Sequence, residues 1–269
     1  MTVTAAVLIA IAAVFTVYFL WENAFVLNIR HEDLGGNIRV LHISDLHKRR
    51  FGRDNSRICS AAEAEKPDMI IISGDIVTRN ETDFTAVRNM LRRLCKTAPV
   101  YMIYGNHEQS LPPEMEEDFL RALGETDVVL LRNESVSISL KGRRIELFGL
   151  KESYGTYKKN GSYRGLERIT PADMERYLGR RPEGETFLIA HNPLFAESYA
   201  EWGADKVFSG HVHGGAVRLF GVGMLSPERK LFPEYSKGVY TVGGTKLLVS
   251  AGLGKLRLFD PPEIVIYEI

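Results

Sequence analysis

Five short apolar segments of this chain each end in residues able to bind a metal ion, and this pattern constrains the fold most. The segments and the clusters that follow them are Arg39–Ser44 with Asp45-Leu46-His47, Met69–Ser73 with Gly74-Asp75, Val100–Tyr104 with Gly105-Asn106-His107-Glu108, Thr186–Ala190 with His191-Asn192, and Lys206–Ser209 with Gly210-His211-Val212-His213. Of the seven histidines, only His31 and His42 lie outside these clusters. Open α/β sheets bind ligands at the carboxyl ends of their strands. The pattern therefore predicts five strands whose ends converge on one site.

The residue types in these clusters suit transition metals. Carboxylate oxygen and imidazole nitrogen together favour Mn, Fe, Zn, Co or Ni, whereas shells of oxygen alone favour Mg and Ca. Two ions that share a carboxylate can activate a water and clamp the oxygens of a phosphoryl group. The candidate ligands are too many for one ion and suit such a pair. They are Asp45, His47, Asp75, Asn106, His191, His211 and His213.

The order of the expected elements predicts a mixed α/β fold. Besides the five strands above, strands are expected at Val136–Leu140, Arg144–Leu150, Val239–Val242, Lys246–Ser250 and Glu263–Glu268, and helices at Asn55–Glu65, Glu81–Lys96, Pro113–Leu123, Pro171–Leu178 and Leu194–Ala200. Alternating strands and helices in the first half favour a parallel sheet with right-handed crossovers. The second half has more strands and fewer helices. We therefore expect two facing sheets rather than one doubly wound sheet.

Composition is that of an ordinary globular protein, with 45% hydrophobic and 25% charged residues. This excludes a disordered, collagen-like or coiled-coil chain. The 34 basic and 34 acidic residues cancel, so we expect no nucleic acid partner. Because Cys59 and Cys95 are the only cysteines in the sequence, a disulfide-stapled scaffold and a metal site built from cysteine are excluded.

The N-terminal segment Met1–Trp21 carries no charged side chain. A helix of about 20 residues rises about 30 Å, enough to cross the hydrocarbon core of a bilayer. Tyr18 and Trp21 suit an interfacial position near its end. The alternatives are a buried core helix and a cleavable signal peptide. An uncleaved anchor is favoured, because no Lys or Arg precedes the apolar run and no small-x-small site follows it directly.

The ordered clusters resemble the motifs of the calcineurin-like metallophosphoesterases. The family pattern of D-x-H, G-D, G-N-H-[DE], H and G-H-x-H is matched in that order by the five clusters, over a span from Arg39 to the C-terminus. Within this superfamily the chain is similar to the membrane-anchored bacterial branch. The resemblance implies a four-layer α-β-β-α sandwich of two mixed sheets, which agrees with the two-sheet expectation above.

The resemblance also implies how the candidate ligands divide between two divalent ions, with Mn, Fe, Zn and Co as the expected metals. It assigns Asp45, His47 and His213 to the first ion, Asn106, His191 and His211 to the second, and Asp75 to a bridge between them.

Three further residues lie close to these ligands in the sequence. The resemblance implies that His107 faces the substrate as a general acid or a phosphate-stabilising group. Glu108 either orients His107 or is an ordinary acidic residue at a helix start. Thr78 stands where many relatives of the branch carry an acidic residue, a departure that concerns substrate choice more than the metal site.

The function implied is phosphoester hydrolysis, in which a metal-bridging hydroxide attacks phosphorus and His107 protonates the leaving group. A phosphodiester or pyrophosphate is favoured as substrate, including that of a lipid or UDP-sugar-lipid near the bilayer. The alternatives are a phosphomonoesterase or nucleotidase and a non-catalytic membrane-tethered binding protein. None of the expected ligands is missing, which disfavours the last.

The chain is thus predicted to have three parts: a transmembrane anchor at 1–21, a juxtamembrane stalk at 22–37 and a catalytic domain at 38–269. Arg30 and Arg39 are the only basic residues between Glu22 and Val40, a weak signal for cytoplasmic retention. We expect a single-pass protein of the cell membrane whose catalytic domain is extracytoplasmic. The sequence gives no indication of oligomeric state.

Two further segments and one histidine complete the expectations. The basic run Lys48-Arg49-Arg50 follows His47 and forms either a solvated face or a surface attractive to an anionic head group. The tyrosine-rich segment Lys151–Gly165 is expected to form a loop over the site. His42 lies inside a strand and is expected in the core.

Overall fold

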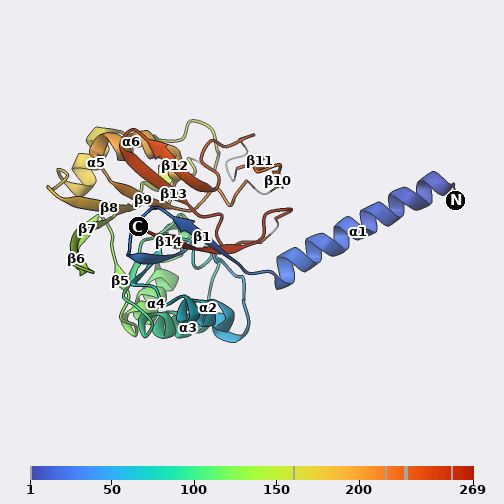
Figure 1. Ribbon diagram of the computed structural model, residues 1–269, viewed down its shortest axis with the longest axis horizontal. Coiled ribbons are helices and arrows are strands. Elements are labelled where there is room, and N and C mark those ends of the chain that lie inside the picture. Colours follow the sequence, from blue (N-terminus) through green and yellow to red (C-terminus); the bar gives the residue numbers. More distant parts are fainter. Residues whose placement is uncertain (1, 160, 216, 227–229, 256) are drawn as a thin grey trace.

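Two facing β-sheets with helices on their outer sides make up the body of the protein, and one long helix projects from it (Figure 1). The computed structural model describes residues 2–159, 161–215, 217–226, 230–255 and 257–269. The helices are α1 (Val3–Phe25), α2 (Ser56–Glu65), α3 (Thr85–Cys95), α4 (Pro113–Gly124), α5 (Pro171–Leu178) and α6 (Ala196–Trp202). The strands are β1 (Asn28–Asp33), β2 (Arg39–Ile43), β3 (Met69–Ile72), β4 (Val100–Met102), β5 (Val129–Leu130), β6 (Glu134–Leu140), β7 (Arg143–Gly149), β8 (Glu185–Ile189), β9 (Lys206–Ser209), β10 (Arg218–Leu219), β11 (Val222–Gly223), β12 (Gly238–Val242), β13 (Thr245–Val249) and β14 (Glu263–Glu268).

Both large sheets are mixed. The first has six strands in the order β1-β14-β2-β3-β4-β5, and the second has six in the order β12-β13-β9-β8-β7-β6. In the first sheet β2, β3, β4 and β5 run parallel, and β14 is antiparallel to β2. In the second, β7, β8, β9 and β13 run parallel between antiparallel partners β6 and β12. The carboxyl ends of the parallel strands carry the five clusters predicted from the sequence.

The alternation of side chains along β3 shows how the layers pack. Met69 and Ile71 lie in the core between the two sheets, whereas Ile70 and Ile72 lie in the core under α2, α3 and α4. A third core lies between the second sheet and helices α5 and α6. Successive strand residues point to opposite faces, so a strand buried on both faces must be apolar throughout. The four-layer α-β-β-α sandwich expected from the sequence is confirmed (Figure 1).

Some boundaries differ from expectation for local reasons. The helix expected from Glu81 begins at Thr85, because the Asp83 side chain accepts the backbone N–H of Thr85 at 2.9 Å and so satisfies a donor at the helix start. The short strands β5, β10 and β11 were not expected, since two-residue pairings leave too little periodicity in the sequence to detect.

Helix α1 is long and apolar enough to cross a membrane, and its apolar window is unburied in the structure. It is therefore not a core helix. The stalk expected at 22–37 is wrong in its middle part, because Asn28–Asp33 forms β1, the edge strand that pairs in parallel with β14. Its charged residues hid the strand pattern. The charge of Arg30 in this strand is paired, because its guanidinium donates to the buried carboxylate of Glu263 at 3.1 Å.

The C-terminal end of α1 is bonded to the loop before β14. The Phe259 N–H donates to the carboxylate of Glu22 at 2.9 Å. The Asn23 amide donates to the Arg257 carbonyl at 2.7 Å, and the Arg257 N–H donates back to Asn23 Oδ1 at 3.1 Å. These groups satisfy polar atoms at the end of the helix and fix α1 against the body.

Candidate metal centre

The strand ends of both sheets bring the predicted ligands to one place. In three groups, each residue offers one donor atom and these atoms lie within 4.8 Å of one another. The groups are Asp45 with His47 and His213, His47 with Asp75 and His107, and Asp45 with Asp75 and His191. Because the groups overlap through the two carboxylates, they form one continuous cluster of donors.

The two carboxylates of the cluster are buried and negatively charged. Burial alone would raise the pKa of Asp45, but His213 and His191 hold it below its ordinary value. Burial also opposes ionisation of Asp75, whose pKa is nevertheless held well below its ordinary value, chiefly by His191. Two buried negative charges at one site need compensating positive charge. A bound cation is the usual source where the neighbouring groups are imidazoles.

His191 carries a bare donor atom that faces this charge. Its Nδ1 lies 2.6 Å from the Ser73 carbonyl oxygen, so Nδ1 carries a proton and donates it to that oxygen. Nε2 is buried 3.4 Å from Asp75 Oδ2 and has no hydrogen-bond partner among the described residues. Burial lowers the pKa of His191, but Asp75 and Asp45 raise it to about 10. At this pKa, Nε2 also carries a proton at pH 7. A metal ion bound between His191 and the two carboxylates would replace the proton on Nε2.

Asn106 and His211 complete the predicted set at the same pocket. Asn106 Oδ1 is buried and has no hydrogen-bond partner among the residues the structure describes. The ring of His211 packs edge-on against that of His191, with centroids 5.1 Å apart. Both Asn106 and His211 line a small pocket together with Asp75 and His213. The oxygen and nitrogen donors around two carboxylates fit divalent cations.

His213 and His47 stack beside Asp45. Their ring centroids are 5.2 Å apart at an interplanar angle of 9°, and His213 Nε2 lies 3.6 Å from Asp45 Oδ1. Burial lowers the pKa of His213 to about 3, with further lowering by His47 and Arg257. An uncharged imidazole is the form that binds metals.

The backbone at the cluster is held in an uncommon conformation. Five of the predicted ligands have positive φ angles, namely Asp45 (52°), His47 (53°), Asp75 (56°), His211 (66°) and His213 (55°). Non-glycine residues seldom adopt this region, and such residues concentrate at functional sites. The sharp turns aim successive side chains of each D-x-H or H-x-H motif at the same point.

Glycines in the motifs allow the loops to approach the carboxylates. A Cβ on Gly105 would lie 2.3 Å from Asp75 Oδ1, and one on Gly210 would lie 1.8 Å from Ser44 Oγ. Real side chains cannot come so close. These two positions therefore need glycine for space, although neither has a positive φ.

His107 lies at the open side of the cluster, against Arg79. The Arg79 guanidinium lies 3.1 Å from His107 Nε2, and the Arg79 backbone N–H donates to His107 Nδ1 at 3.3 Å. Burial lowers the pKa of His107 to about 4, with contributions from His47 and Arg79 against the opposite effect of Asp75. The imidazole is therefore neutral at pH 7. Arg79 could not be identified from the sequence, because its partner His107 lies 28 residues away.

Glu108 begins a short 3-10 helix at Glu108–Ser110, as one alternative expected, but its carboxylate also has a structural role. Its buried carboxylate accepts the backbone N–H groups of Asp75 at 2.9 Å, Gly105 at 2.8 Å and Val77 at 3.0 Å, and thereby ties the loops after β3 and β4 together. Burial and the Asp75 charge raise the pKa of Glu108 to about 8, although the three donors favour its charged form. Glu108 thus shapes the loop that carries Asp75.

A second buried acid supports the other side of the site. Glu152 Oε1 accepts the Asn192 N–H at 2.9 Å and the Tyr199 hydroxyl at 2.8 Å, and its other oxygen accepts the Tyr157 hydroxyl. The Tyr157 ring in turn packs edge-on against His211, with centroids 4.8 Å apart. Glu152 lies outside the five motifs, and only the fold reveals its contacts.

The tyrosine-rich segment expected over the site does lie there, with residue 160 outside the described residues. Tyr154, Tyr157, Lys158 and Tyr163 line the pocket of about 140 Å³, which four of the predicted ligands also line, namely Asp75, Asn106, His211 and His213. Tyr163 also lines an adjacent cavity of about 570 Å³, which extends to Lys230. The two spaces together are large enough for a substrate with a sizeable group beside its phosphate.

The basic run after His47 is partly structural. Arg49 is buried, and its guanidinium donates to the carbonyl oxygens of Gly254, at 2.9 Å, and Asn23. Burial lowers the pKa of Arg49 to about 10. Arg49 is therefore neither a solvated residue nor a free binding group, because the end of α1 covers it.

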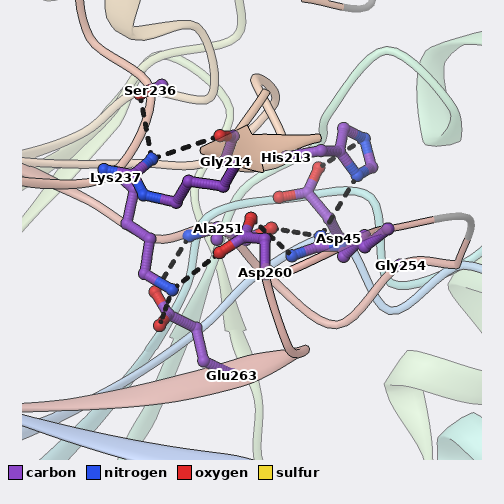
Figure 2. A network of polar contacts seen from close by, with 12 residues as sticks. Asp45, His213, Gly214, Ser236, Lys237, Ala251, Gly254, Asp260 and Glu263 are labelled. Carbon is purple, nitrogen blue, oxygen red and sulfur yellow. Dashed lines mark hydrogen bonds and ion pairs between the residues drawn. The ribbon is translucent and has the colours of Figure 1, made fainter. Parts of the chain in front are cut away.

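A buried ionic network lies behind His213 (Figure 2). Arg257 is buried, and its guanidinium lies 3.3 Å from His213 Nδ1 and 3.8 Å from the Asp260 carboxylate. The Lys237 ammonium bridges Asp260 at 2.9 Å and Glu263 at 2.7 Å. Since Arg257 also bonds Asn23, this network joins a predicted ligand to the end of α1.

Comparison with known proteins finds a family model and several relatives that match this chain. The family model described as calcineurin-like phosphoesterase matches residues 38–215. An uncharacterized metallophosphoesterase of Aquifex aeolicus is 28% identical, with 94% of this chain and 92% of the relative covered. The phosphodiesterase YaeI of Escherichia coli is 27% identical, with 90% and 87% covered.

Two further proteins extend the comparison. The UDP-2,3-diacylglucosamine pyrophosphatase LpxG of Chlamydia muridarum is 23% identical, with 85% of this chain and 82% of the relative covered. Among solved structures, the NAD nucleotidase of Haemophilus influenzae matches with a TM-score of 0.51 at 16% identity, covering 80% of this chain and 50% of that one. The latter likeness is one of fold.

Proposed function

The chain belongs to the calcineurin-like phosphoesterase family of hydrolases, and we propose that it cleaves a phosphodiester or pyrophosphate bond with a dinuclear metal centre. The observation that carries this proposal is the overlap of three donor groups through Asp45 and Asp75, two buried carboxylates surrounded by imidazoles. Such a donor set is costly to bury without cations and is suited to two of them.

We assign the ligands as the motifs imply. Asp45, His47 and His213 would hold one ion, Asn106, His191 and His211 the other, and Asp75 would lie between them. When bound, two divalent ions supply Lewis acidity to the phosphoryl oxygens and lower the pKa of a water molecule. The identity of the metals is left to experiment.

The remaining steps fall to His107 and Arg79, which lie side by side at the open edge of the cluster. The Arg79 guanidinium offers charge and N–H donors to a phosphoryl oxygen. His107 is neutral in the free protein, but a phosphate anion beside it favours its charged form. It can then hold a proton and pass it to the leaving oxygen.

We further propose that the substrate is linked to a lipid. Helix α1 would anchor the protein in a membrane and keep the site near the bilayer, with the catalytic domain on the extracytoplasmic side. The cavity of about 570 Å³ beside Tyr163 offers room for a group attached to the phosphate. One relative is named as a pyrophosphatase of a diacyl sugar nucleotide, a substrate of this type.

The test uses the full chain in detergent, stripped of metal and reloaded with Mn, Zn, Fe, Co or Mg. We expect metal-dependent cleavage of bis-p-nitrophenyl phosphate in preference to p-nitrophenyl phosphate, and cleavage of a UDP-linked diacyl sugar. Preference for the monoester would indicate a phosphatase instead. No hydrolysis of any of the three by the protein with two bound ions would contradict the proposal.

A further inference from the structure

Large apolar side chains are exposed on one small region of the surface around the hairpin β10–β11. Phe220 at its tip is fully exposed, and Leu231 and Phe232 are 70% and 60% exposed. Backbone pairing joins the hairpin to the following segment, because Leu225 pairs with Leu231 and the Phe232 N–H donates to Met224 O. We name this region the hairpin patch and define it as Leu219, Phe220, Val222, Leu225, Leu231 and Phe232.

The turn of the hairpin is made from an unfavourable residue. Leu219 pairs with Val222, so Phe220 and Gly221 form a two-residue turn, with φ angles of 49° and 80°. This turn type favours Asn or Asp before Gly, and a bulky residue at positive φ is disfavoured. Phe220 therefore weakens the turn while its ring contacts water. A partner for the ring would account for its presence.

The hairpin patch is continuous with α1 through the loop before β14. The Arg218 N–H donates to the Leu258 carbonyl at 3.0 Å, where the hairpin begins. The next residue, Phe259, packs its ring against Tyr18 and Phe15 of α1, with centroids 5.4 Å and 6.0 Å apart. Figure 1 shows β10 and β11 on the side of the body from which α1 departs.

If α1 crosses a bilayer, the contact between Phe259 and Phe15 fixes how deep the loop before β14 lies relative to the membrane surface. Phe15 lies about one and two-thirds turns, about 9 Å, further toward the N-terminus than Trp21. Interfacial aromatic residues such as Trp mark the membrane boundary, so Phe15 lies below that boundary. Phe259 touches Phe15 and therefore lies in the same layer. Because Arg218 at the start of the hairpin is hydrogen-bonded to Leu258, the hairpin would lie at the edge of the membrane layer that contains Phe259.

We propose that the hairpin patch inserts into the interface of the same bilayer that holds α1, as a second attachment of the protein. Apolar and aromatic side chains lose contact with water at the headgroup boundary, and the exposed Lys230 beside the patch suits anionic headgroups. Because α1 is already fixed against the body, a second attachment would set how the body is turned relative to the membrane. Lys230 also lines the cavity beside the metal site, so this orientation turns that cavity toward the lipid surface. The inference concerns placement and stands without the proposed reaction.

The test places an environment-sensitive label at Phe220→Cys in the full chain, in a background of Cys59→Ala and Cys95→Ser. The protein is reconstituted in nanodiscs of phosphatidylethanolamine and phosphatidylglycerol. We expect blue-shifted emission and loss of fluorescence when doxyl-labelled lipids are included. Matched labels are placed at Ile9→Cys in α1, as the membrane-embedded reference, and at exposed Val129→Cys in β5, as the aqueous reference.

The outcomes separate the possibilities. Quenching at positions 9 and 220 but not at 129 supports the second attachment. Quenching at position 9 alone, with position 220 behaving like position 129, overturns it. Absence of quenching at position 9 also overturns it, because α1 would then not share a bilayer with the patch. Circular dichroism of each labelled protein checks that the fold is kept, which is expected because Phe220 is fully exposed.

Discussion

The buried carboxylate of Glu108 fixes the backbone of Asp75 on the side away from the pocket. The backbone N–H of Asp75 donates to Glu108 Oε2 at 2.9 Å, while Asp75 Oδ1 accepts the backbone N–H of His107 at 2.8 Å. Asp75 is thereby fixed through both its backbone and its side chain, and one oxygen, Oδ2, is left facing His191 at 3.4 Å. The position of the central carboxylate thus depends on a second acid that makes no contact with the pocket.

Replacing Glu108 by Gln should therefore damage the metal site indirectly. In either orientation the amide would turn an NH2 group toward backbone donors that the carboxylate now accepts. We expect a loss of about 1–3 kcal/mol in the free energy of unfolding and about a 10–100-fold loss of metal affinity. Denaturant unfolding and chelator competition measure the two quantities. Glu117→Gln, at an exposed position of α4, is the matched control. If both variants have the same free energy of unfolding and the same metal affinity, Glu108 does not hold the Asp75 loop in place.

Asp75→Asn should weaken binding of both ions, because the substitution removes the charge shared by the two halves of the cluster. We expect turnover to fall by more than about 100-fold, the upper end for residues that only support ligands. Elemental analysis of the purified protein gives the metal content per chain. Asp83→Asn, at the start of α3 and outside the site, should keep both ions. Two tightly held ions and full activity in Asp75→Asn would rule out the bridging assignment.

His107→Ala should preserve metal content and lower kcat by about 10²–10⁴-fold, the range for loss of a general acid. Arg79→Ala should chiefly raise KM, since its guanidinium is assigned to binding. Steady-state kinetics with bis-p-nitrophenyl phosphate separates the two effects. If His107→Ala instead releases an ion, His107 is a ligand and its assignment as the acid is wrong.

His42 should make the protein less stable in mild acid. Burial and the Arg30 charge lower its pKa to about 3, whereas the unfolded chain has an ordinary value near 6.5. Above that value both states are neutral and His42 contributes nothing to the pH dependence. Below it only the unfolded chain takes up the proton, so the free energy of unfolding falls by about 2 kcal/mol between pH 6.5 and 5.

The measurement compares the native chain with His42→Gln, which keeps a nitrogen near Ser73 Oγ, the partner of His42 Nε2 at 2.8 Å. Urea unfolding at several pH values should show a difference between the two proteins that changes by about 2 kcal/mol over this interval. Parallel curves would show that His42 is not the group responsible.

Much of the fold and the composition of the cluster could be predicted because they rest on local patterns. Runs such as Met69–Ile72 are apolar at every position, as strands buried on both faces must be. The D-x-H and H-x-H spacings mark turns that aim side chains together, as the positive φ angles of Asp45 and His213 show. Both features are encoded within a few residues and need no knowledge of distant partners.

The supporting residues could not be predicted, because their partners are distant in sequence. Glu152 and Asn192 are separated by 40 positions, and Arg49 and Gly254 by 205. The basic run Lys48-Arg49-Arg50 is typical of a solvated surface, and only the fold shows that the end of α1 covers Arg49. The same holds for β1, whose charged residues look like a stalk until β14 lies beside them.

Strand β1 also limits how far the body of the protein can lie from helix α1. Only Val26 and Leu27 separate α1 from β1, and two extended residues span at most about 7 Å. A tether this short has no reach, so the active site cannot sample the surrounding solution for distant targets. A pull on α1 would load the parallel pairing of β1 and β14 in shear, with its hydrogen bonds resisting together rather than opening one by one. A membrane that held α1 would therefore keep the body of the protein at its surface, and substrates would have to diffuse to it.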